Sequence, residues 1–226
     1  TMHKIDIGQA TIDAILERRG RLHFENIEPA KTALLVVDMQ NSFVKEGVGH
    51  AWVPEAASIV PNINALATAL RAAGGLVVWI VTTYTEETRA NWSHFHDELW
   101  TPERSAKRAE ALSAGHPAHD LYDALEPGAD DFTVHNTHYS AFIQGSSALD
   151  APLSKPGLEN VIVTGTPPTV SGFTEGFERL LPTVTRVVVA PAHTVGHPTP
   201  ACVKRLWSGP SFLDDWLSRR MGMAAK

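Results

Sequence analysis

The sequence predicts a three-layer α/β fold, in which helices cover both faces of a doubly wound parallel sheet. Several runs of four to six residues are almost entirely apolar and rich in valine, isoleucine and leucine, as expected of strands that are buried on both faces. Segments with apolar residues at helical spacing lie between these runs. Because strands and helices alternate, we expect consecutive strands to run parallel and to be joined by helical crossovers.

The first half of the chain contains a helix, a strand, a second helix and a second strand, in that order. Residues 5–19 carry apolar residues at helical positions and precede a glycine, which is a frequent helix stop. Residues 33–38 are a continuous apolar run that ends in the carboxylate of Asp38. Residues 60–73 are followed by a glycine pair that ends the second helix, and the apolar run 76–81 then predicts the second strand.

In the second half, three more apolar runs alternate with helical segments, and the chain closes with helical sequence. The last helix begins at a serine, a favoured N-cap residue, and is amphipathic. In chain order, the predicted elements are strand 132–135, helix 148–154, strand 160–164, helix 171–180, strand 186–190, a helical stretch from 198–202, and helix 211–219.

Composition predicts one domain over residues 1–226, of which residues 1–30 form an N-terminal helical extension, because 226 residues with 43% hydrophobic content can bury one sizeable core. The net charge of -6 is not clustered and no basic stripe occurs, so we expect no nucleic-acid partner. No apolar run is long enough to cross a bilayer, so we expect no membrane partner and a cytoplasmic protein. The single cysteine, Cys202, excludes an intrachain disulfide and is expected to be an inert small hydrophobe.

Three motifs follow the predicted strands. They read LLVVDMQN over residues 34–41, YSAF over residues 139–142 and VIVTGTPPTVS over residues 161–171. In these motifs and their order, the chain resembles the isochorismatase-like cysteine hydrolases, a superfamily of amidases, nicotinamidases and isochorismatases. The resemblance covers residues 30–195 and implies an isochorismatase-like, Rossmann-like fold. Since ligands bind beyond the carboxyl ends of the strands in open α/β sheets, Asp38 is expected at the active site.

The resemblance implies an Asp-Lys-Cys triad, of which this chain keeps only the aspartate. Asp38 matches the aspartate, Asn136 stands at the lysine position and Ser171 stands at the cysteine position. A serine hydroxyl is a much weaker nucleophile than a thiolate unless a base activates it. Pro167 stands where relatives contribute a backbone N–H to the oxyanion hole, and proline has none. Three parts of the acyl-transfer apparatus are therefore changed.

These changes favour non-covalent acid–base catalysis centred on Asp38, on a small carboxylated or cyclic metabolite of a biosynthetic pathway. Asn136, Tyr139 and Ser171 would orient the substrate. Isochorismatases of the phenazine-pathway type set a precedent, since they lack the cysteine and use the aspartate to protonate an enol ether. Two alternatives remain: a catalytically inactive pseudoenzyme that serves as a binding module, and an amidase-type cysteine hydrolase that carries a Cys-to-Ser change at Ser171.

Other candidates for substrate binding surround these positions. Residues 82–115, called the insertion below, are rich in aromatic and charged side chains and follow a strand end, as lids and binding loops do. Their aromatic side chains could equally pack in a dimer interface. Arg89 could hold a substrate carboxylate, as an arginine does in phenazine-type relatives, or form a surface salt bridge. Histidines near the strand ends could replace the missing base or be structural. The substrate-binding candidates are Gln40, Arg89, Trp92, His138, Tyr139, Pro167 and His193.

We expect no cofactor and no metal. No phosphate-binding glycine motif is present, and the pair His94 and His96 lacks a third ligand. Histidines 135, 138, 193 and 197 are near predicted strand ends, and one of them could rebuild a Ser-His-Asp arrangement with Ser171. The resemblance further implies a homodimer or homotetramer that acts on a small molecule.

Overall fold

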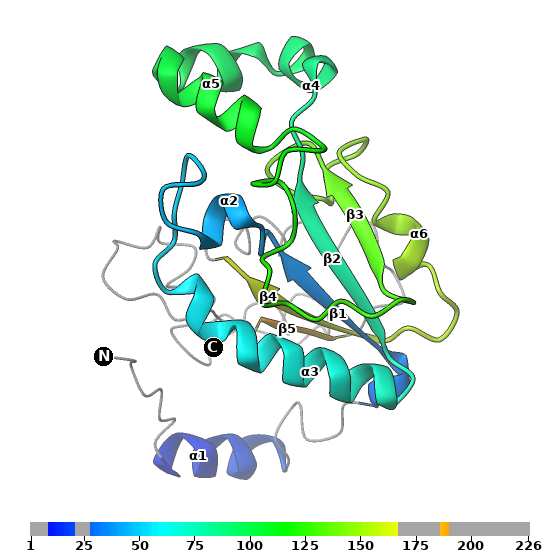
Figure 1. The fold of residues 1–226 in the computed structure, drawn as a ribbon. Coiled ribbons are helices and arrows are strands. Elements are labelled where there is room, and N and C mark those ends of the chain that lie inside the picture. The colour runs from blue at the N-terminus through cyan, green and yellow to red at the C-terminus, as the bar shows by residue number, and fades with distance from the viewer. Residues whose placement is uncertain (1–8, 21–27, 167–185, 190–226) are drawn as a thin grey trace.

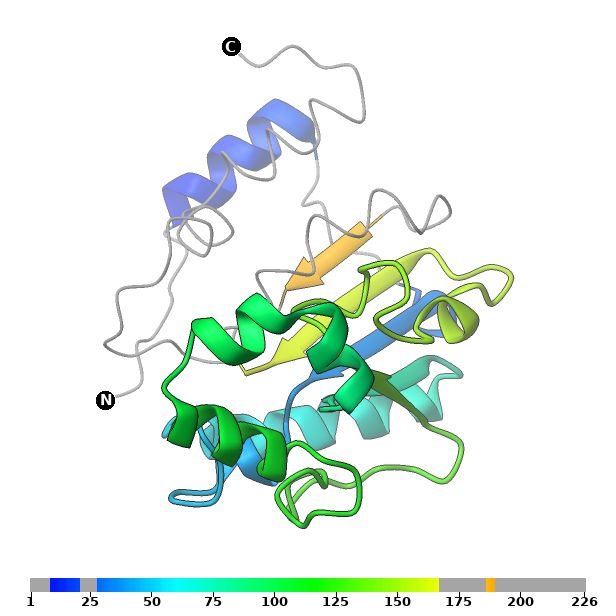
Figure 2. The ribbon, with the colours of Figure 1, turned by 90° about the horizontal axis from the view of Figure 1, so that it is seen from above.

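The computed structural model describes residues 9–20, 28–166 and 186–189, and within them the predicted parallel sheet is present. Five strands lie in the order β3-β2-β1-β4-β5, and every adjacent pair is parallel (Figures 1 and 2). The chain builds outward from β1 to β3 and then returns to the other side of β1. This reversal is the topological switch point at which open α/β sheets bind ligands. The strands are β1 (Thr32–Val37), β2 (Leu76–Thr82), β3 (Phe132–Asn136), β4 (Asn160–Gly165) and β5 (Arg186–Val189).

Predicted helices 5–19, 60–73 and 148–154 have counterparts in the described residues. The predicted helix 148–154 is shorter in the structure, where it begins at Asp150, because Pro152 has no N–H to donate to the carbonyl of Ala148. Predicted helices 171–180, 198–202 and 211–219 lie outside the described residues. The helical segments are α1 (Gln9–Arg19), η1 (Pro29–Lys31), α2 (Asn41–Val44), η2 (Ala56–Ile59), α3 (Val60–Ala72), α4 (Glu86–Asn91), η3 (His94–Glu98), α5 (Pro102–Ala111) and α6 (Asp150–Leu153). Helices α2, α4 and α5 were not predicted.

Two hydrophobic clusters cover the two faces of the sheet. All residues of β1 are buried, as predicted for a strand covered on both sides. Leu34 and Val36 face α3, which contributes Ile63 to the same cluster. Successive side chains of a strand point to opposite faces, so Leu35 faces the other cluster, which includes residues of α6 and of the YSAF motif. The core therefore has the three layers that the sequence predicts.

The insertion lies beyond the carboxyl ends of β2 and β3, where Figure 1 shows α4 and α5 above the sheet. The hydroxyl of Thr85 caps α4 by accepting from Thr88 N at 3.1 Å. Helix α5 begins with Pro102, a favoured first residue, after the N-cap Thr101. Between α4 and α5, the short segment η3 is a single π-helical turn, a feature that is frequent at functional sites.

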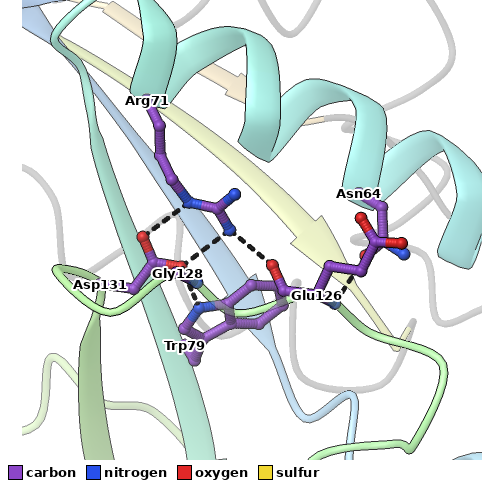
Figure 3. Close-up of polar contacts among 6 residues, drawn as sticks. All are labelled: Asn64, Arg71, Trp79, Glu126, Gly128 and Asp131. Atoms are coloured by element: carbon purple, nitrogen blue, oxygen red, sulfur yellow. Dashed lines mark hydrogen bonds and ion pairs between the residues drawn. The ribbon is translucent and has the colours of Figure 1, made fainter.

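A polar centre at Asp131 joins α3, β2 and the segment that leads into β3 (Figure 3). Its two carboxylate oxygens accept from Arg71 Nε at 2.8 Å and Arg71 Nη2 at 2.9 Å. Trp79 Nε1 donates at 2.8 Å and the backbone N–H of Gly128 at 2.7 Å. Burial raises the pKa of this carboxyl, but these donors outweigh it and the pKa lies below its usual range.

Candidate functional site

Asp38 is the first residue after β1, and its backbone is unusual. Its φ is 54°, and it is the sole non-glycine residue with positive φ in the described parts of the chain. Such backbone conformations are strained and cluster at active sites. The Asp38 side chain is 2% exposed. Thr82 Oγ1 donates a hydrogen bond to Asp38 Oδ1 at 2.8 Å, so the end of β2 holds the carboxylate in place.

Gly165 allows the end of β4 to approach β1 closely. Its φ is 135°, and a Cβ atom at this position would lie 2.0 Å from the carbonyl oxygen of Val37. Thr166 N then donates to the same Val37 oxygen at 3.0 Å. The chain therefore leaves β4 beside Asp38. Pro167 and Ser171 follow outside the described residues, so their placement near Asp38 stays a prediction.

Asn136 lies in register with Thr82, on the next strand of the sheet. The two side chains share a face of the sheet, which is the face on which Thr82 meets Asp38. Asn136 is fully buried, and its amide closes a turn: Nδ2 donates to His138 O at 2.7 Å and Oδ1 accepts from His138 N at 3.2 Å. These contacts support a role in shaping the loop after β3.

Gln40 has a structural role that the sequence did not reveal. It is fully buried, and its amide nitrogen donates to Thr82 O at 3.1 Å and to His119 O at 2.7 Å. Its oxygen accepts from Thr82 N at 2.8 Å. Both N–H groups of the amide are therefore used by the backbone, and these contacts do not support the predicted substrate contact.

Arg89 lies at the surface of α4 in an exposed ion pair with Asp97, in which Arg89 Nε and Asp97 Oδ1 are 2.9 Å apart. The structure thus favours the second of the two interpretations that the sequence left open. The predicted contact with a substrate carboxylate has no support in this position, because the guanidinium faces its partner at 51% side-chain exposure.

The remaining aromatic candidates form a wall between the insertion and the loop after β3. Trp92 stacks on His138 with ring centroids 5.2 Å apart and meets Tyr139 edge-on at 5.2 Å. Phe95 stacks on Trp92 at 4.2 Å and contacts Tyr139 at 4.7 Å. Burial lowers the pKa of His138, so the ring is neutral over a wider pH range than an exposed histidine. This wall suits a planar or apolar part of a ligand.

The histidine predicted at position 135 points away from Asp38. Its Nδ1 contacts Thr83 Oγ1 at 2.9 Å, and the same hydroxyl contacts His119 Nε2 at 2.8 Å. His135 and Asn136 are successive residues of β3, so their side chains point to opposite faces of the sheet. The hydrogen-bonded group of His119, Thr83 and His135 is therefore separate from the Asp38 carboxylate. His193 and His197 lie outside the described residues.

No functional role for Thr82 or Arg108 was predicted from the sequence, and His96 was considered only for a metal site that was rejected. Thr82 was placed just beyond the predicted strand, although its register with Asn136 is what directs it to Asp38. Arg108 and His96 are buried in the insertion, 2.9 Å apart. The Thr-Pro-Glu start of α5 is a helix signal that could have located Arg108 on a helix.

In the part of the chain that the structure describes, no group of three histidine, cysteine, aspartate or glutamate side chains is arranged to hold a metal ion. The same residues contain no helix of sufficient length and apolar character to span a membrane.

Sequence comparison identifies a family match for the fold and site described above. The isochorismatase domain model matches residues 32–167. The ureidoacrylate amidohydrolases RutB of Acinetobacter baylyi and Serratia proteamaculans are 30% and 29% identical over 150 and 148 residues. These matches cover 62% and 61% of this chain but 60% and 59% of the relatives. The chain thus spans less than two thirds of the curated relatives it matches.

Solved structures show the same fold. A cysteine hydrolase from Pseudomonas syringae pv. phaseolicola has a TM-score of 0.59 and 26% identity, covering 80% of this chain and 84% of that one. An isochorismatase family protein from Desulfovibrio vulgaris has a TM-score of 0.60 and 26% identity, covering 86% and 92%. N-carbamoylsarcosine amidase from Thermoplasma acidophilum, at 20% identity and a TM-score of 0.55, covers 84% of this chain and 92% of that one and supports the fold alone.

Proposed function

Because the chain belongs to the isochorismatase family, we propose that it is a hydrolase whose chemistry is centred on Asp38. The observation that carries this proposal is the backbone of Asp38, which is held in the left-handed region at the switch point of the sheet. A buried carboxyl group at such a place is a suitable general acid or base.

The attacking group in this proposal is water. Asn136 stands where amidases of the family have a lysine, and its amide is occupied by His138 backbone groups. Without that lysine, Ser171 lacks the cation that would help to activate a nucleophile. For an amide, Asp38 would take a proton from water as the water oxygen bonds to the carbonyl carbon, and would give that proton to the nitrogen as the C–N bond breaks. For an enol ether, Asp38 would protonate the alkene carbon and regain a proton from the water that adds to the resulting cation, and the hemiketal so formed would release the alcohol. In both cases Thr82 holds one carboxylate oxygen.

The names of the curated relatives support a C–N bond as the bond cleaved, since both are amidohydrolases. The enol-ether precedent supports a C–O bond instead. A panel of ureido acids, carboxylated amides and carboxylated enol ethers therefore covers the two bond types, with product release as the readout.

Variants of Asp38 and Ser171 distinguish general acid–base catalysis from covalent catalysis. Asp38→Asn should lower kcat by roughly 10²–10⁴-fold, the usual contribution of a general acid or base. Ser171→Ala should keep kcat within about tenfold, because no covalent intermediate forms on it; loss of the serine nucleophile of a covalent enzyme costs about 10⁶-fold.

Three results contradict the proposal. If Asp38→Asn is as active as the wild type, the carboxylate is not catalytic. If Ser171→Cys gains amide hydrolysis while the wild type has none, the chain is an amidase with a replaced nucleophile. Ligand binding without turnover by the wild type, on any compound of the panel, identifies the inactive binding module.

A further inference from the structure

Arg108 is a buried cation that has no acidic partner among the residues that the structure describes. It extends from α5 and is 8% exposed. Its Nη1 contacts His96 Nδ1 at 2.9 Å, and its guanidinium lies over the ring of Phe95, 4.7 Å from the centroid. Among the described residues, no carboxylate lies within ion-pair distance of Arg108. An enclosed cation without a counter-ion is costly, so such a group normally has an anion to bind.

His96 adds a second donor to the same spot. Arginine can only donate, so Nδ1 of His96 is the acceptor of their hydrogen bond and the neutral ring carries its proton on Nε2. His96 is 1% exposed, and its Nε2 has no hydrogen-bond partner in the structure. Among the described residues, the His96 N–H therefore lacks an acceptor and the neighbouring guanidinium lacks a counter-ion. An anion bound here would supply both.

The groups around Arg108 and His96 also lack acceptors and negative charge among the described residues. Trp100, whose ring centroid is 6.0 Å from that of Phe95, has a buried Nε1–H without a partner. Burial, together with the positive charges of Arg108, Arg104 and Lys107, lowers the pKa of nearby His50 to about 4. The electrostatic potential around Phe95 is therefore positive.

We propose that Arg108 and His96 form a binding site for one carboxylate group of a small planar molecule. The guanidinium offers a planar fork that matches two carboxylate oxygens, and His96 Nε2–H provides a further donor. The aromatic wall of Trp92, Phe95 and Tyr139 would hold the body of the ligand. A single carboxylate also balances the one positive charge of Arg108, which a phosphate dianion would exceed.

This site deepens the proposed function and rests on it in one respect: the carboxylate is taken to belong to the substrate. The end of β3 and the loop after it connect the Arg108 site to Asp38. Tyr139 contacts Phe95 from the loop after β3, and Asn136, the last residue of β3, shares a sheet face with Thr82, which bonds Asp38. The insertion would hold the substrate by its carboxylate while Asp38 acts from the sheet.

Calorimetric titration with benzoate at neutral pH tests the site, with benzamide as the neutral analogue of the same shape. We expect saturable benzoate binding and benzamide binding at least about tenfold weaker, since hydrogen bonds to charged groups are the stronger ones. Ring-nitrogen NMR of the wild type should show that benzoate shifts the His96 Nε2 signal. These two readouts require no variant.

Arg108→Met should weaken benzoate binding by about 10- to 100-fold. Lys107→Met, the neighbouring position on the same helix with the same loss of charge, should change it by less than about threefold because Lys107 is exposed. If Arg108→Met does not fold, Arg108→Lys keeps the charge but loses the planar fork, and should weaken binding by about tenfold.

The site is overturned if the wild type does not bind benzoate, if benzamide or inorganic phosphate binds as tightly, if His96 Nε2 does not shift, or if Arg108→Met or Arg108→Lys binds benzoate like the wild type. Asp38→Asn separates the two proposals, because it should lower kcat by roughly 10²–10⁴-fold and leave benzoate binding unchanged. Binding that depends on Arg108, with turnover that does not depend on Asp38, would contradict the proposed function alone.

Discussion

At the scale of single residues, Asp38 depends on neighbours that arrive from other strands. Its carboxylate accepts from Thr82 at the end of β2, and its strand is approached by Gly165 at the end of β4. Neither neighbour is close to Asp38 in sequence. The site is therefore positioned by the register of the sheet, and each of these two residues can be tested by a small substitution.

Thr82→Val removes the hydroxyl that holds Asp38 and keeps the shape of the side chain. We expect kcat to fall by about 10- to 100-fold with little change in KM, since a hydrogen bond to a charged group contributes about 1.5–3 kcal/mol. Thr82→Ser restores the hydroxyl and should recover most of the activity. Equal loss in both variants would show that Thr82 acts through packing and not through its hydrogen bond.

Gly165→Ala should destabilise the protein because the new Cβ meets the β1 backbone, with Val37 O at 2.0 Å. We expect the free energy of unfolding, measured by urea denaturation, to fall by about 2–4 kcal/mol from overpacking and strained backbone. Gly157→Ala is the matched control, since its φ is also positive but nothing lies within 4 Å of the new Cβ. Similar losses in both variants would contradict the close approach of β4 to β1.

At the scale of secondary-structure elements, one buried carboxylate holds three of them together. Asp131 accepts from Arg71 on α3, from Trp79 on β2 and from the backbone before β3 (Figure 3). This centre sets the position at which β3 begins, and the register of β3 with β2 places Asn136 opposite Thr82. A stability centre at one end of the strands thus contributes to the geometry of the site at the other end.

Asp131→Asn should lower the free energy of unfolding by about 2–4 kcal/mol, because it leaves a half-buried guanidinium without its bidentate partner. Asp123→Asn is the control, since Asp123 pairs with Lys45 at the surface and such pairs contribute about 0–1 kcal/mol. Chemical denaturation at pH 7 measures both. A loss for Asp131→Asn no larger than that of the control would show that the centre is dispensable.

At the scale of the whole molecule, buried histidines make stability depend on pH. Burial lowers the pKa of His50, His96, His119 and His138 below that of an exposed histidine. The native state keeps these rings neutral, so the unfolded chain binds more protons once the pH falls below about 6.5. Stability should therefore be fully present above that pH and decline as the pH falls toward 4.

The decline can be measured by urea denaturation between pH 7 and pH 4.5, where Asp131 remains ionised because its pKa is lowered from 3.8. His50, with its pKa lowered from 6.5 to about 4, should account for up to about 3 kcal/mol of the total. His50→Phe should remove that share. His94→Gln should not, because His94 is exposed and its pKa is raised by Glu98. An unchanged slope in His50→Phe would contradict the assignment.

The strands and their order of alternation with helices could be predicted from the sequence because burial on both faces requires continuous apolar runs. The predicted strand 76–81 differs from β2 by one residue, and 33–38 differs from β1 by one residue at each end. Asp38 could be placed for a similar reason, since a polar residue directly after a buried strand must lie at the sheet edge. These features depend on residues adjacent in sequence.

The partners of the polar side chains were decided by the tertiary structure alone. Gln40 pairs with Thr82 backbone, 42 positions away. The buried cation of the insertion is Arg108 and not Arg89, because α5 carries Arg108 inward against Phe95 while α4 leaves Arg89 in solvent. Local periodicity determines which segments form strands and helices, whereas hydrogen bonds between distant residues exist only once the sheet has assembled and its register has brought their atoms together.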